Sequence, residues 1–237
     1  MKNKWIGFWD YTVVLTYCSL ITAVVGIIVA LNGDGHPYVG AMLLLLCGLF
    51  DTFDGKVARS KKNRTEQEKA FGIQIDSLAD LVAFGVFPVC IGFALYYRDL
   101  LDVQEIGLRS RLAGVPLWIL ITLSALFVLC ALVRLAYFNV TVEETQGADA
   151  EEKIYWGLPV TITSLIFPSY LLVRHIFYIH YINISWVYFV LLIIVAILFI
   201  RQFKLKKPTN SMISIAIAIG AVEFMAVVAA WVIGRGK

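Results

Sequence analysis

Four aspartates lie close together in the chain, and their spacing places them on two helical faces. Asp51 and Asp54 are three residues apart, and Asp76 and Asp80 are four residues apart. Residues three or four apart share one face of an α-helix, so each pair directs its carboxylates the same way. Four carboxylates that met would repel one another unless a cation compensated their charge. Oxygen ligands without Cys or His favour a hard divalent ion: Mg²⁺, Mn²⁺ or Ca²⁺.

Such a group of acids has a recognised use in phosphate chemistry. Four carboxylates can hold two ions and leave positions free for phosphate oxygens, as in two-metal phosphoryl-transfer sites. The small residues Gly55, Ala58 and Gly72 lie beside the acids and would let a backbone or a ligand approach closely. Nearby cations suit an anionic ligand; they are Lys56, Arg59, Lys61 and Lys62. The alternative is a helix end with solvated acids, in which case the matching faces are a coincidence.

The elements that must position these acids are membrane helices. Hydrophobic residues make up 60% of the chain and charged residues 16%, well below the quarter that is typical of soluble proteins. Apolar runs of about 20 residues recur, and each is long enough to cross a bilayer core. A β-barrel would show short alternating segments instead. The sequence therefore predicts an all-α, polytopic membrane bundle.

About seven spans are expected, in a single domain over residues 1–237. They are Thr12–Leu31, Tyr38–Arg59, Phe71–Tyr97, Gly114–Phe138, Gly157–Phe177, Ile184–Ile200 and Ser211–Ile233. Six of them form a core over about residues 12–203, and the seventh is an additional C-terminal helix at about 211–233. Trp5, Trp9 and Tyr11 precede the first span and predict a short interfacial segment, because aromatic rings favour the membrane surface.

Basic residues set the expected orientation. Most of them fall on one side of a seven-span arrangement; they are Lys2, Lys4, Lys56, Arg59, Lys61, Lys62, Arg64, Lys69, Arg201, Lys204, Lys206 and Lys207. The positive-inside rule makes that side cytoplasmic. Arg98, Arg109 and Arg111 fall on the other side. We therefore expect a multi-pass protein of the cell (cytoplasmic) membrane, with its N-terminus and the aspartates facing the cytoplasm.

The stretch from Asp51 to Asp80 resembles the signature of the CDP-alcohol phosphatidyltransferases. That signature reads D-x-x-D-G-x-x-A-R, a spacer, and G-x-x-x-D-x-x-x-D. All eight positions match, with Asp51, Asp54, Gly55, Ala58, Arg59, Gly72, Asp76 and Asp80. The twelve-residue spacer between Arg59 and Gly72 is longer than the family's common eight or nine. Its additional residues are polar, so they fit a longer loop or helix end.

The resemblance implies a reaction and a role for each residue. These enzymes join a CDP-linked lipid to an alcohol and release CMP. By resemblance, Asp51, Asp54 and Asp76 would bind the metal ions, and Asp80 would help to coordinate them and act as the base towards the alcohol. Gly55, Ala58 and Gly72 would make room for the cytidine diphosphate, and Arg59 would stabilise its position or the acids. The implied cofactor is a divalent cation, Mg²⁺ or Mn²⁺ with Ca²⁺ left open, as two ions.

Three further stretches resemble the phosphatidylserine synthase branch and favour serine as the acceptor. They are IDSLADLVAFGVFP (75–88), RLAYFNV (134–140) and GLP (157–159). Arg134 is the acceptor-binding candidate, since a guanidinium can hold a carboxylate through two hydrogen bonds. Bracing of the aspartates by Arg134 is the alternative. Inositol, choline and glycerol phosphate remain open as acceptors.

A divalent-cation transporter and a purely structural membrane subunit are the competing classes. Intramembrane acids also occur in transporters, but here they lie near one membrane face and no inverted repeat is visible. The expected partners are CDP-diacylglycerol, a small alcohol and membrane lipid; a homodimer is left open, and no nucleic acid is expected. Glu223 in the last span stays unassigned between function and a hydrogen-bonded contact. Arg174 and His175 are expected to extend to the membrane interface.

Overall fold

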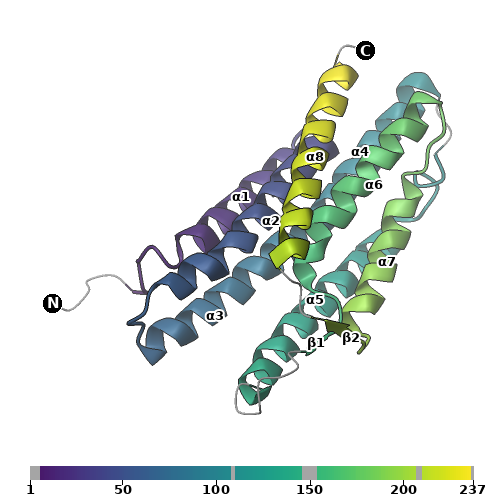
Figure 1. The fold of residues 1–237 in the computed structure, drawn as a ribbon. Helices are drawn as coiled ribbons and strands as arrows, with labels where there is room; N and C mark the ends of the chain where they lie inside the picture. Colours follow the sequence, from purple (N-terminus) through teal and green to yellow (C-terminus); the bar gives the residue numbers. More distant parts are fainter. Residues whose placement is uncertain (1–5, 108–109, 146–153, 207–209, 236–237) are drawn as a thin grey trace.

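The computed structural model describes residues 6–107, 110–145, 154–206 and 210–235, and it shows a bundle of long helices (Figure 1). The helices are α1 (Val14–Leu31), α2 (Pro37–Ser60), α3 (Glu66–Asp80), α4 (Phe87–Ile106), α5 (Leu117–Thr145), α6 (Thr163–Ile179), α7 (Trp186–Ile200) and α8 (Asn210–Arg235). A π-helical turn, η1 (Leu81–Val86), joins α3 to α4, and a 3₁₀ turn, η2 (Val160–Ile162), leads into α6. The prediction of a helical membrane bundle is confirmed.

Five segments in the described part of the chain are long and apolar enough to cross a membrane. They are Val14–Leu31, Pro37–Ser60, Glu66–Glu105, Leu117–Thr141 and Val160–Ile179. The segments Trp186–Ile200 and Ile217–Ala229 are apolar but shorter. The count of seven spans therefore stays a prediction. Trp5 of the expected interfacial segment lies outside the described residues, whereas Trp9 and Tyr11 are exposed just before α1.

The third span is a single helix from Glu66 to Ile106, in which the π-helical turn η1 separates α3 from α4. Pro88 explains the irregularity, because it has no N–H to donate to the carbonyl of Phe84 four residues earlier. Thr163 Oγ1 from α6 donates to that carbonyl instead, at 3.3 Å, and the Phe87 N–H bonds to Val82 O in the π pattern. The helix therefore changes its winding directly after Asp80. Turns of this kind are frequent at functional sites.

The start of α3 lies five residues before the predicted Phe71, because a capping box begins the helix at Glu66. Thr65 Oγ1 accepts from the Glu68 N–H at 3.2 Å, and Glu68 Oε2 accepts from the Thr65 N–H at 2.8 Å. This arrangement satisfies two backbone donors at the helix start. Lys61 Nζ then bridges Glu68 (2.8 Å) and Asp10 (2.7 Å). The residues before α1 are thereby fixed to the loop between α2 and α3.

The opposite end of the bundle is fastened by a buried ion pair. Arg174 in α6 is 3% exposed and lies 3.5 Å from Asp99 in α4. Asp99 also accepts from Ser185 Oγ at 2.8 Å and from Asn183 Nδ2 at 2.6 Å. The expectation that Arg174 extends to the interface is wrong, because a buried carboxylate faces it from the neighbouring helix and compensates its charge. His175 packs edge-on against Tyr38 instead.

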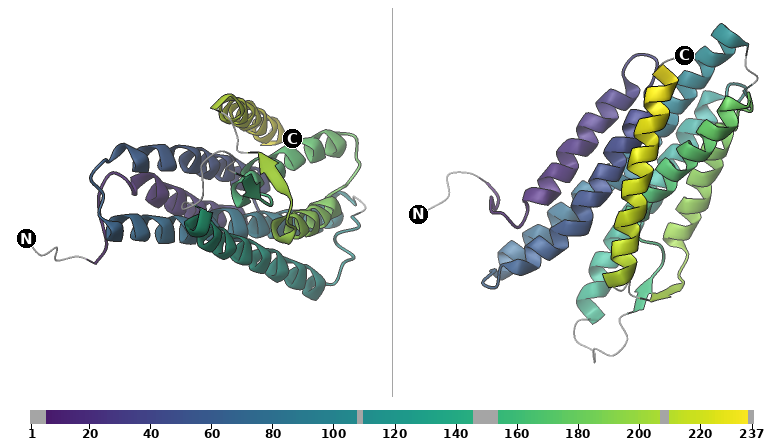
Figure 2. Two further views of the ribbon diagram at one scale, coloured as in Figure 1. Left: turned by 60° about the horizontal axis from the view of Figure 1, so that its bottom comes forward. Right: turned by 45° about the horizontal axis from the view of Figure 1, so that its top comes forward.

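Two three-residue strands and α8 complete the structure. The strands β1 (Ile154–Trp156) and β2 (Lys204–Lys206) pair in antiparallel fashion and bring the segment after α5 to the end of α7. Helix α8 packs on α2 and α6 on the outside of the bundle (Figures 1 and 2). Glu223 of α8 is buried and accepts a hydrogen bond from Ser169 Oγ of α6. The structure thus shows a hydrogen-bonded contact, which was one of the two roles left open for Glu223.

Candidate metal and nucleotide site

The aspartates of α2 and α3 converge at one end of the bundle. Asp51, Asp76 and Asp80 each offer a carboxylate oxygen, and these oxygens lie within 4.8 Å of one another. The helices run in opposite directions, so Asp51 comes next to Asp80 and Asp54 comes next to Asp76. All four acids are half-buried or buried. The expectation that two helical faces bring the four acids together is confirmed.

Helix α1 completes the surroundings of the acids. Thr16 Oγ1 donates to Asp54 Oδ2 at 3.2 Å, and both residues are buried. Asp54 is thereby held in place by a neutral donor on a third helix, and no cation forms an ion pair with it in the described part of the chain. Thr16 was not predicted from the sequence. Its hydroxyl group lies three residues before that of Ser19 in an apolar run, and this spacing was the available signal.

The two glycines of the signature leave space that arginine side chains cover. A Cβ atom at Gly55 would lie 3.2 Å from Nη1 of Arg59, and one at Gly72 would lie 2.6 Å from Nη2 of Arg64. Ala58 is half-buried, one helical turn after Asp54. Arg64 also donates from Nη2 to the Glu68 carbonyl at 3.1 Å, while its buried Nε has no partner among the described residues. Two guanidinium groups therefore lie over the two glycines.

Arg134 of α5 is buried and makes its contacts with residues other than the aspartates. Its Nε donates to Leu158 O at 3.1 Å, and its guanidinium lies over the Phe138 ring at 5.1 Å. Gly157 gives it room, since a Cβ there would be 3.5 Å from Arg134 Nε. No aspartate is within ion-pair distance of Arg134 in the described residues. Bracing of the acids by Arg134 is therefore not observed.

Asn139 of α5 is the polar residue that does reach the aspartate helix. Its Nδ2 donates to Ser77 Oγ at 2.8 Å, and Ser77 lies between Asp76 and Asp80. The sequence pattern of residues 134–140 predicted a role for Arg134 and not for Asn139. An amide in an otherwise apolar helix segment, five residues after Arg134, was the available signal.

The donor set fits a hard divalent cation. Asp51, Asp76 and Asp80 supply only oxygen atoms, which Mg²⁺, Mn²⁺ and Ca²⁺ prefer. The free cysteines, Cys18, Cys47, Cys90 and Cys130, are not part of the group. Close carboxylates in a largely apolar bundle need compensating positive charge, and no lysine or arginine forms an ion pair with these three in the described residues. The group can therefore bind a metal ion.

Comparison with known proteins agrees with this geometry. The family described as CDP-alcohol phosphatidyltransferase matches residues 11–234. The chain is 35% identical over 158 residues to the CDP-diacylglycerol–serine O-phosphatidyltransferase of Saccharomyces cerevisiae. The aligned residues make up 65% of this chain and 49% of the yeast protein. The chain is 33% identical over 144 residues to the archaetidylserine synthase of Methanothermobacter thermautotrophicus, covering 61% and 51% respectively. A Helicobacter pylori CDP-diacylglycerol–serine O-phosphatidyltransferase is 32% identical over 134 residues, covering 56% and 46%.

The chain belongs to the CDP-alcohol phosphatidyltransferase family, because the family match covers nearly all of it and includes the converging aspartates. The match ends at residue 234, within α8. The matched part of the chain spans about half the length of these curated relatives.

Proposed function

We propose that the protein transfers a phosphatidyl group from CDP-diacylglycerol to the hydroxyl group of a small alcohol, with L-serine favoured, and releases CMP. The observation that carries this proposal is the convergence of carboxylate oxygens from Asp51, Asp76 and Asp80 within 4.8 Å. A diphosphate linkage carries negative charge that must be neutralised during transfer. An acid group that can bind divalent ions, in a helical membrane bundle, suits a lipid substrate with that linkage.

Asp51, Asp54, Asp76 and Asp80 would hold the metal, as two ions. When bound, the ions neutralise phosphate charge and favour departure of the CMP oxygen. Thr16 orients Asp54 through its hydrogen bond. Gly55, Ala58 and Gly72 would admit the cytidine diphosphate, and Arg59 would contact it where its guanidinium now covers Gly55. The family match supports the phosphatidyl-transfer chemistry for which these residues are proposed.

Asp80 is the proposed base. The alcohol oxygen attacks the phosphorus of the phosphatidyl group and loses its proton to the Asp80 carboxylate. The phosphorus–oxygen bond to CMP breaks, and CMP leaves with the electron pair. Asp80 suits this role because it ends the acid face of α3, directly before the π-helical turn η1. Base catalysis of this type contributes about 10² to 10⁴ in rate.

Serine is the favoured acceptor because the S. cerevisiae and H. pylori relatives are named for it, and the archaeal relative is named for a serine lipid. Arg134 is the proposed ligand of the serine carboxylate. In the structure it engages one carbonyl, Leu158 O, through Nε. Its role requires the terminal nitrogens to turn towards the aspartates when serine binds.

Seven membrane crossings, a cytoplasmic N-terminus and a site open to the cytoplasm complete the proposal. The distribution of lysines and arginines along the sequence, which places most of them in the segments at the acid end, supports this orientation. A homodimer and a location in the cell (cytoplasmic) membrane belong to the same proposal.

The test is release of CMP from CDP-diacylglycerol by the purified protein, measured with L-serine, inositol, choline and glycerol phosphate in parallel. Serine should support the fastest release and give a serine phospholipid. CMP release with another alcohol, and none with serine, would identify that alcohol as the acceptor in place of serine. Absence of CMP release with every alcohol, together with uptake of Mn²⁺ into vesicles that contain the protein, would support a transporter instead.

A further inference from the structure

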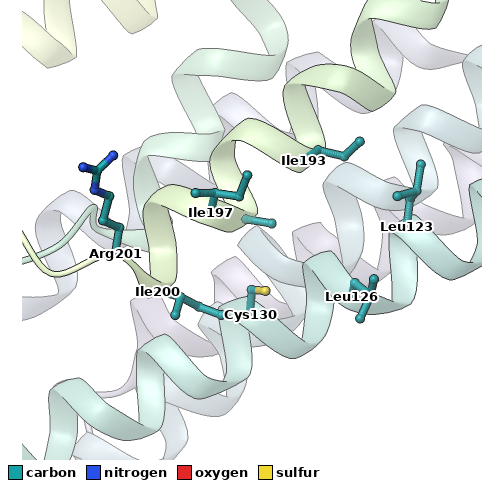
Figure 3. A pocket seen from close by; sticks show the side chains of 8 residues that line it. Leu123, Leu126, Cys130, Ile193, Ile197, Ile200 and Arg201 are labelled. Carbon is teal, nitrogen blue, oxygen red and sulfur yellow. The ribbon is translucent and has the colours of Figure 1, made fainter.

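A groove between α5 and α7 lies apart from the aspartates. It encloses about 450 Å³, and Figure 3 shows the side chains that line it. They are Leu123, Leu126, Cys130, Ile193, Ala196, Ile197, Ile200 and Arg201. All but Arg201 are apolar or weakly polar. The groove exists because Cys130 and Ala196 are small, while Leu126, Ile193, Ile197 and Ile200 around them remain exposed.

Arg201 provides a cation at one end of this groove. It follows directly after α7, at the acid end of the bundle, and its side chain is exposed. No described residue forms an ion pair or a hydrogen bond with its guanidinium. The segments that line the groove, 123–130 and 193–200, contain no acid, and the acids of α5, Glu143 and Glu144, lie in its last turn. Within the described part of the chain, the positive charge of Arg201 therefore has no partner.

We infer that this groove binds one acyl chain of an anionic phospholipid of the surrounding bilayer, with the lipid phosphate on Arg201. An apolar channel on membrane-spanning helices, ending in a cation at the level of the helix ends, matches the order of acyl chain and phosphate in a lipid. A basic residue at that level attracts anionic headgroups.

The groove opens on the side of α5 opposite its contact with α3, which is also the side that carries Arg134. The proposed occupant is a bilayer lipid, because none of the residues that line the groove is one of the aspartates. Asn139 of α5 faces Ser77 of α3. Cys130 in the groove is nine residues before Asn139, which is about two and a half helical turns and hence the opposite face. Helix α7 packs against α5 and α4, away from α2 and α3.

The test is native mass spectrometry of the protein released from nanodiscs of equal phosphatidylcholine and phosphatidylglycerol, without CDP-lipid. The wild-type protein should retain one phospholipid, with phosphatidylglycerol favoured about fivefold. Arg201→Gln should lose that preference. Arg111→Gln is the matched control, because Arg111 packs on Trp186 at the other end of α7, and it should behave as wild type. Cys130→Phe, which fills the groove, should retain neither lipid.

Equal retention of both lipids by the wild type, or identical behaviour of the two arginine variants, would overturn the inference. Loss of a dimer in Cys130→Phe with unchanged lipid would assign the groove to a second copy. A raised KM for CDP-diacylglycerol in Arg201→Gln with unchanged lipid retention would assign it to the substrate. If Cys130→Phe does not fold, Leu126→Trp at the exposed rim provides the same test. Since lipid retention is measured without turnover, its outcome is independent of the proposed activity.

Discussion

Asn139 Nδ2 donates a hydrogen bond of 2.8 Å to Ser77 Oγ, and this contact joins α5 to the turn of α3 between Asp76 and Asp80. A fourth helix thereby fixes the position of the two acids that the mechanism places at the metal and at the acceptor hydroxyl.

Asn139→Ala should impair acceptor use. We expect kcat/KM for serine to fall up to about tenfold, the effect of one lost hydrogen bond, with the KM for CDP-diacylglycerol nearly unchanged. Gln202→Ala is the control, because Gln202 makes an exposed 3.4 Å bond to the nearby Tyr137, and it should leave both values unchanged. If Asn139→Ala lowered the thermal stability but left the kinetic constants unaltered, the contact would be purely structural.

Gly72→Ala should separate stability from nucleotide binding. The added Cβ would meet only the flexible end of Arg64, and alanine favours a helix over glycine by about 0.5–1 kcal/mol. We therefore expect unchanged or slightly higher thermal stability but a clearly raised KM for CDP-diacylglycerol. Gly220→Ala in α8, where a Cβ makes ordinary 3.5 Å contact with Leu165, is the control. An unchanged KM in Gly72→Ala would remove Gly72 from the nucleotide site.

Arg134→Lys tests the assignment of the serine carboxylate. Lysine keeps the charge but loses the paired donors of the guanidinium. The KM for serine should rise by the equivalent of about 1–3 kcal/mol, and the KM for CDP-diacylglycerol should rise much less. Arg59→Lys, which lies over Gly55, should show the reverse pattern. An equal rise in KM for both substrates in Arg134→Lys would indicate that the arginine supports the fold through Leu158 instead.

The contact of Asp10 with Lys61 predicts an acid-sensitive attachment of the segment before α1. Hydrogen bonds from Lys61 and then Thr12 lower the pKa of Asp10 from 3.8 to about 2. A carboxylate whose pKa is lowered by folding stabilises the folded state at pH values above its ordinary pKa. That contribution should be lost as the pH falls from about 4 to about 2. Asp10 also raises the pKa of Lys61, so the pair persists through neutral pH.

Hydrogen exchange of amides 6–12 measures this attachment. Asp10→Asn should speed exchange at neutral pH by less than about fivefold, the range for an exposed pair, and the difference from wild type should vanish near pH 2. Asp34→Asn, at an exposed acid of the loop between α1 and α2, should have no effect. A difference between Asp10→Asn and wild type that persisted below pH 2 would contradict the ion-pair account.

Much of the arrangement could be predicted because membrane helices follow simple rules of length and spacing. The apolar runs predicted the positions of α1, α2 and α5–α7, and the intervals between Asp51, Asp54, Asp76 and Asp80 predicted their meeting across antiparallel helices. The start of α3 at Glu66 was also readable from Thr65 and Glu68 as a capping box, but hydropathy alone placed it later, because the first turns of α3 are polar.

Contacts between distant residues could not be predicted. The burial of Arg174 depends on Asp99, which is 75 residues away along the chain and carries no local sign of pairing. The hydrogen bond of Asn139 to Ser77 likewise depends on the register of α5 against α3. Pro88 indicates an irregular helix, but the hydrogen bond from Thr163 to the Phe84 carbonyl depends on how α6 packs against this segment.

The central claim is that the aspartate group holds metal ions and that Asp80 accepts the proton of the alcohol. The most direct measurement is CMP release from CDP-diacylglycerol and L-serine by chelator-treated protein, before and after addition of Mn²⁺ or Mg²⁺, for wild type and Asp80→Asn. The account predicts no release without metal, recovery in the wild type on metal addition, and a rate at least ~10² lower in Asp80→Asn. Full release in saturating chelator, or near-normal turnover by Asp80→Asn, would contradict it.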